Sequence, residues 1–135
     1  MQLLQWNKEL EIGIENVDSQ HKQLINMINE LTLAVEYNQQ NSSLLPIVDR
    51  LLEYAGNHFQ VESGIFAQYE FPNRVDHEAE HATFIDKVKY IRRQCELLDT
   101  PMSAKIREFL LHWFINHIKS KDMEYKRFIY KATHQ

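Results

Sequence analysis

Residues 17–35 read VDSQHKQLINMINELTLAV, and the apolar positions in this stretch recur at steps of three and four residues. Because an α-helix has 3.6 residues per turn, such positions fall on one face. The stretch predicts a helix over residues 19–39 whose buried face carries His21, Leu24, Ile25, Ile28, Leu31, Thr32 and Val35. A histidine therefore leads a stripe that should lie in a protein core.

Three further segments show the same helical period. They predict helices over residues 44–69, 74–97 and 102–130. Helices of similar length joined by short connections predict an all-α fold, an antiparallel up-down-up-down four-helix bundle. Residues 1–18 are expected to form an extended N-terminal arm, and residues 1–135 a single domain.

Capping residues mark the expected helix ends. Asp18 or Ser19 is predicted to cap the first helix, and Thr100 or Ser103 to cap the last. Gly56 and Gly64 fall inside the second helix, where glycine is unfavourable. They either let a neighbouring helix approach closely or have no such role.

Composition excludes several classes of protein. The formal charge is −4, with acidic and basic residues interleaved, so no basic patch is expected to bind nucleic acid. The chain shows no leader-like start and no apolar run approaching twenty residues, which predicts a cytoplasmic protein without membrane insertion. The single cysteine, Cys95, falls on the apolar stripe of its helix, so we interpret it as a core residue rather than a redox group.

Polar residues with metal-binding chemistry lie on these apolar faces. His58 and Glu62, and likewise His77 and His81, are four residues apart, a step that turns a helical side chain by only about 40°. Each pair therefore shares a face. In an antiparallel bundle, these pairs and His21 all lie toward the same end.

The fourth segment contributes His117 and Asp122, whose five-residue step turns the direction by about 140° on a regular helix. The two side chains would flank the apolar face from its edges and could still reach a central site. We expect the helix to loosen near residues 119–121, since ligand demands often distort helices at functional sites.

A buried carboxylate such as Glu62 is costly without a partner, and a metal cation bound by neighbouring imidazoles would remove that cost. A structural zinc ion takes four ligands. The constellation offers seven, which favours two metal ions: His21, His58, Glu62, His77, His81, His117 and Asp122.

These segments resemble the hemerythrin family in its bacterial form. The matching residues are Trp6, GIENVDSQH at 13–21, HFQVE at 58–62, HEAEH at 77–81 and WFINHIKSKD at 113–122. The resemblance implies a hemerythrin-like domain over the whole chain. It also implies a centre of two iron ions (Fe2+/Fe3+) that Glu62 and Asp122 bridge together with an oxo or hydroxo group.

By the same resemblance, one iron would be bound by His77, His81 and His117. The other would be bound by His21 and His58, which leaves an open position for dioxygen.

The activity that the resemblance implies is reversible dioxygen binding for storage, delivery or sensing, and not an enzymatic one. Five neutral imidazoles and only two carboxylates should also disfavour high-valent iron. Helix geometry places four apolar residues around the open position: Leu24, Phe59, Trp113 and Phe114, the last standing where relatives often have leucine. The alternatives are a di-iron oxidoreductase or stress-response protein acting on peroxide or nitric oxide, and a sensory module that changes a partner contact.

Overall fold

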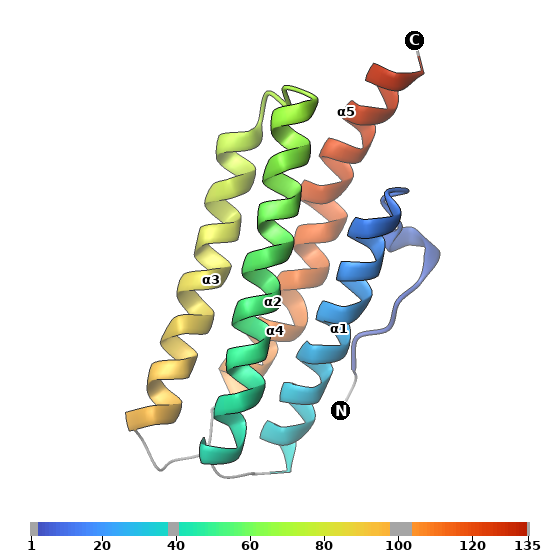
Figure 1. The fold of residues 1–135 in the computed structure, drawn as a ribbon. Helices are drawn as coiled ribbons and strands as arrows, with labels where there is room; N and C mark the ends of the chain where they lie inside the picture. Colours follow the sequence, from blue (N-terminus) through green and yellow to red (C-terminus); the bar gives the residue numbers. More distant parts are fainter. Residues whose placement is uncertain (1–2, 38–40, 98–103, 135) are drawn as a thin grey trace.

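Four helical rods pack side by side in a computed structural model that describes residues 3–37, 41–97 and 104–134 (Figure 1). The first three rods are α1 (Glu15–Glu36), α2 (Asn41–Gln68) and α3 (Arg74–Leu97). The fourth is built from α4 (Ala104–His117), the π-helix η2 (Ile118–Asp122) and α5 (Met123–Thr133). Successive rods run in opposite directions, and the described residues contain no strand, so the predicted all-α four-helix bundle is confirmed.

Some predicted helix ends differ from the structure, and others lie outside its described residues. The second helix begins at Asn41 and not near residue 44, and the last described helix ends at Thr133 and not near residue 130. The predicted end of the first helix at residue 39 lies outside the described residues, as do the proposed caps Thr100 and Ser103.

The N-terminal arm lies along the bundle and contains a short 3₁₀ helix, η1 (Lys8–Leu10). The Asn29 side chain makes two hydrogen bonds of 2.9 Å with the backbone of Leu4, accepting from its N–H and donating to its carbonyl. Leu10 and Ile12 are buried in the core. The arm is therefore held to the bundle by side-chain hydrogen bonds to its backbone as well as by apolar contact.

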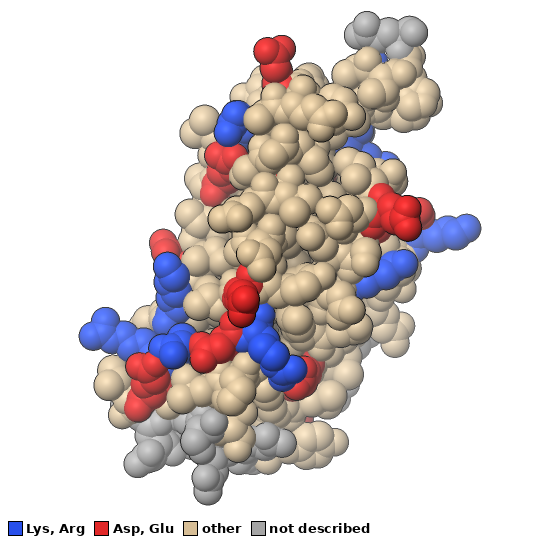
Figure 2. Space-filling view, in the orientation of Figure 1, with Lys and Arg blue, Asp and Glu red and all other residues tan. Residues whose placement is uncertain are grey.

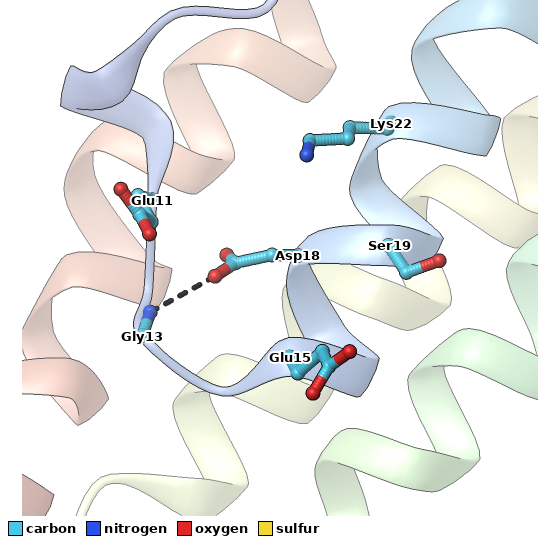
Figure 3. A pocket seen from close by; sticks show the side chains of 6 residues that line it. All are labelled: Glu11, Gly13, Glu15, Asp18, Ser19 and Lys22. Carbon is cyan, nitrogen blue, oxygen red and sulfur yellow. Dashed lines mark hydrogen bonds between the residues drawn. The ribbon is translucent and has the colours of Figure 1, made fainter.

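Helix α1 begins at Glu15, before the predicted start, and neither Asp18 nor Ser19 is its N-cap. The N-cap is Ile14, which makes no side-chain hydrogen bond. The Asp18 carboxylate instead accepts hydrogen bonds from the backbone N–H groups of Ile12, at 2.8 Å, and Gly13, at 3.1 Å. Figure 3 shows the bond to Gly13. A carboxylate in the first turn of a helix can satisfy the N–H groups of the preceding chain, and here it ties the arm to α1.

Apolar side chains from all four rods and the arm form one core, in which Cys95 is buried as expected. No helix in the described ranges combines the length and hydropathy that a membrane crossing requires. On the face drawn in Figure 2, acidic and basic side chains are mixed. Ion pairs join neighbouring rods, as between Arg50 and Glu30 at 2.8 Å.

No neighbouring helix lies close to the glycines of α2, because a Cβ atom built on Gly56 or Gly64 would meet nothing within 4 Å. We therefore expect Gly64→Ala to raise the free energy of unfolding by about 0.8–1 kcal/mol, the difference in helix propensity. Gly13→Ala is the matched control. Gly13 lies in equally open space but has a φ of 91°, so this substitution should lower the free energy of unfolding by about 1–2 kcal/mol. Denaturant unfolding of both variants measures the two changes in the free energy of unfolding. Changes of the same sign would contradict the prediction.

Candidate metal centre

All seven side chains that the sequence singled out converge on one buried cluster. His21 comes from α1, and two pairs come from α2 and α3. The remaining two come from the fourth rod. Each residue is at most 4% exposed: His21, His58, Glu62, His77, His81, His117 and Asp122.

Three imidazoles point their Nε2 atoms at the Asp122 carboxylate. Oδ1 lies 3.0 Å from His77 and 3.1 Å from His117. Oδ2 lies 3.2 Å from His21. One carboxylate thus contacts histidines from three different rods.

Glu62 occupies the equivalent place on the other side of the cluster. Its Oε1 atom lies 3.1 Å from His81 Nε2 and 3.3 Å from His58 Nε2. Its Oε2 atom lies 4.0 Å from His21 Nε2. Together the two carboxylates contact all five imidazoles, and His21 lies near both.

The donor atoms fall into two groups that share Glu62. Within each group, the donor atoms all lie within 4.8 Å of one another. One group has five members and the other has three: Glu62, His77, His81, His117 and Asp122 in the first, and His21, His58 and Glu62 in the second. Several of these atoms are buried without a hydrogen-bond partner, including both Asp122 oxygens and Glu62 Oε1. Orphaned buried carboxylate oxygens facing imidazole nitrogens are costly, and two cations between them would satisfy the set.

The predicted loosening of the fourth rod is confirmed as the π-helix η2. The N–H of Met123 donates to the carbonyl of Ile118, five residues earlier. A π-turn places residues five apart on the same side of the helix, so Asp122 joins His117 in the cluster.

A family model described as "Hemerythrin HHE cation binding domain" matches residues 12–129, nearly the whole described bundle. The chain belongs to the hemerythrin family. Its cluster of imidazoles and carboxylates agrees with the cation binding that the family description names.

Two curated relatives are similar to this chain over most of their length. A bacteriohemerythrin of Stenotrophomonas maltophilia is 30% identical, with the match covering 93% of this chain and 80% of the relative. A hemerythrin-like protein of Naegleria gruberi is also 30% identical, covering 90% and 89%. The crystal structure of a wild-type hemerythrin has the same fold, with a TM-score of 0.84 at 22% identity over 93% of this chain and 97% of that one.

Three polar residues that sequence reasoning missed surround this hemerythrin cluster. Tyr125, fully buried, donates its hydroxyl hydrogen bond to Glu62 Oε2 at 2.6 Å. Gln20 Oε1 lies 2.7 Å from His58 Nδ1, and Glu80 Oε1 lies 2.8 Å from His117 Nδ1. Gln20 and Glu80 are adjacent in sequence to candidate ligands, and Tyr125 lies on the apolar face beside one. Each contact, however, crosses between rods and has no sequence signal.

Glu62 is held as a carboxylate in the metal-free hemerythrin. Burial and the neighbouring Asp122 charge both oppose its ionisation. The charge of His58 and the close approach of the His58 and His81 imidazoles to Oε1 outweigh both effects and lower the pKa of Glu62 to about 2. The cluster thus offers an anionic oxygen to a cation throughout the neutral range.

His117 shows the opposite balance. Burial disfavours its charged form, but Asp122 and Glu80 outweigh that effect and raise the pKa of His117 to about 9. A metal ion bound at Nε2 must therefore displace a proton from His117 at neutral pH.

Aromatic rings enclose the hemerythrin cluster. Phe59 stacks on His81 with centroids 3.8 Å apart, and Trp113 stacks on His117 at 4.7 Å. The Phe114 ring meets His21 edge-on at 5.5 Å. Leu24, the fourth predicted lining residue, is 1% exposed on α1.

Proposed function

We propose that this hemerythrin binds dioxygen reversibly at a non-haem di-iron centre, for oxygen storage, delivery or sensing rather than as an enzyme. The observation that carries the proposal is the convergence of five buried imidazoles on two buried carboxylates, of which both Asp122 oxygens and Glu62 Oε1 lack hydrogen-bond partners. Membership of a cation-binding family supports it.

In this proposal, the two buried carboxylates, Glu62 and Asp122, would help to hold both ions. The histidines divide as the family resemblance implies, with His77, His81 and His117 on one ion, and His21 and His58 on the other. When bound, a pair of iron ions would supply reversible dioxygen binding.

Residues around the centre restrain the Glu62 carboxylate and exclude water. Tyr125 holds one oxygen of Glu62, so the carboxylate cannot rotate freely. The rings of Phe59, Trp113 and Phe114 pack against the histidines and exclude water. With Leu24 they form the proposed lining of the oxygen pocket.

The test is the iron content of the purified protein, together with its optical spectrum after anaerobic reduction, recorded through repeated cycles of air and argon. We expect two iron ions per chain and an absorption band that appears in air and disappears in argon. Irreversible conversion to a ferric product would instead support a di-iron oxidoreductase or a stress-response protein that acts on peroxide or nitric oxide.

Replacing Phe114 with leucine should speed the loss of this band in air. Phe114 is 1% exposed and lies against His21, so the smaller side chain leaves space in which water can approach the His21 side of the centre. The measurement is the decay rate of the band at constant oxygen pressure.

Phe84→Leu is the matched control for this change. Phe84 is equally buried, but the ring contacts described for it are with Phe59, Phe109 and Trp113 and not with a histidine. An equal acceleration in both variants would indicate general loosening of the core, and no acceleration in Phe114→Leu would remove this ring from the pocket.

A further inference from the structure

The five imidazoles of the centre differ in what holds their second ring nitrogen. Only two of them have an Nδ1 partner among the described residues. The Nδ1 of His117 faces the Glu80 carboxylate at 2.8 Å, whereas the Nδ1 of His58 faces the neutral amide oxygen of Gln20 at 2.7 Å. The other three imidazoles have buried Nδ1 atoms without a hydrogen-bond partner.

Glu80 is held from two sides. It lies on α3 beside the candidate ligand His81, yet its Oε1 atom reaches across to His117 on the fourth rod. Its Oε2 atom lies 3.6 Å from Nζ of Lys121, which donates to Asp76 Oδ2 at 2.5 Å. Since Lys121 belongs to the π-helix, these contacts tie α3 to the turn that presents Asp122.

A carboxylate and an amide act differently on the imidazole that they hold. Both accept a hydrogen bond from Nδ1–H and so direct the Nε2 lone pair toward a metal ion. The carboxylate is charged, so it makes the stronger bond and renders the imidazole a better electron donor. His117 should therefore be the stronger ligand and His58 the weaker one.

The composition of the two donor groups acts in the same direction. The group around His117 offers five donor residues within 4.8 Å of one another, and the group around His58 offers three. A position with more anionic and imidazole donors binds a divalent ion more tightly.

We propose that Glu80 is a positioning residue that makes the two metal positions unequal, so that the position beside His117 binds its ion more tightly than the position beside His58. This inference rests on the proposed function, since it presumes two metal positions. Glu80 thereby adds to the difference in affinity that the two donor groups already create.

The test is a Co(II) titration of the metal-free protein under argon, followed by the visible absorption of the bound ion. We expect two separate binding steps. Glu80→Ala removes both the acceptor and the charge, and should weaken the tighter step by about 10–100-fold while leaving the weaker step unchanged. Glu80→Gln keeps the size and the acceptor, and should weaken the same step by a smaller factor.

Glu78→Gln is the matched control. Glu78 lies on the same helix with a side chain 33% exposed, against 34% for Glu80, and it pairs with Arg74 at 3.5 Å and not with a histidine. Both binding steps should match the wild type in this variant.

Gln20→Glu distinguishes this role of Glu80 from a merely structural one, because a structural role predicts no effect of this substitution on the two binding steps. It gives His58 a carboxylate partner in place of the amide, so the weaker step should tighten and the two steps should approach one another. In the iron-loaded protein, Glu80→Gln should also raise the reduction potential, because the weaker donor stabilises ferric iron less.

These outcomes distinguish failure of the inference about Glu80 from failure of the proposed function. Two Co(II) ions, with the tighter step weakened in the Glu80 variants and not in Glu78→Gln, support the inference. Two ions with an unchanged ratio of affinities overturn the role of Glu80 and leave the proposed function standing. Uptake of fewer than two ions by the wild type overturns both.

Discussion

Glu62→Ala is expected to reduce the bound iron from two ions per chain to one or none and to abolish the reversible absorption band. Glu62 is the one residue that both donor groups share. Even outer partners of a metal ligand typically contribute 10–100-fold to affinity, so losing a shared carboxylate should cost more than about 100-fold. Iron analysis after gel filtration and the air–argon cycles measure both effects.

Glu62→Gln separates this effect from misfolding, because it keeps the size of the side chain and an oxygen that can accept from Tyr125. We expect it to retain the helical circular dichroism spectrum and to lose the metal. Glu53→Gln, an exposed position on the same helix, is the control and should keep two irons. Two retained irons in both Glu62 variants would show that this carboxylate is not a ligand.

The fold was predictable because its signal is local. The apolar stripes of the helices follow the helical period, and α3 begins at Arg74 and ends at Leu97, as expected. The first helix was predicted less well, since Asp18 looks like a capping residue from sequence alone. Its hydrogen bonds go to Ile12 and Gly13, and the φ of 91° at Gly13 that turns the arm toward α1 is a property of the folded chain.

The candidate ligands were predictable for a different reason. A histidine or carboxylate on an apolar stripe conflicts with burial, and this conflict is visible in sequence. The contacts that hold the cluster from outside carry no such conflict. Glu80 and Gln20 are ordinary polar residues at the edge of a helix, and only packing between rods brings them to His117 and His58.

Between about pH 6.5 and 9, the metal-free protein should lose stability as the pH rises, whereas the stability of the metal-loaded protein should stay nearly constant. In the metal-free protein, Asp122 and Glu80 outweigh burial and raise the pKa of His117 to about 9. The stabilisation from that raised pKa is complete below the unfolded value near 6.5 and is lost as pH rises toward 9. The free energy of unfolding should therefore fall across this range, by at most about 1.4 kcal/mol per pH unit.

A bound metal ion removes this pH dependence. It requires His117 without its Nε2 proton, so raising the pH removes a competitor and strengthens metal binding. A ligand that binds only the folded state adds about 2.7 kcal/mol per site at a free concentration of one hundred times its Kd. The stronger metal binding offsets the loss seen in the metal-free protein, so the stability of the loaded protein should stay nearly constant across this range.

Thermal or denaturant unfolding at several pH values, with and without Co(II), measures the divergence. His117→Gln should flatten the metal-free profile, because it removes the group whose proton is lost. Parallel profiles for the two forms of the wild type would mean that metal binding displaces no proton from His117, and would place this imidazole outside the metal's ligands.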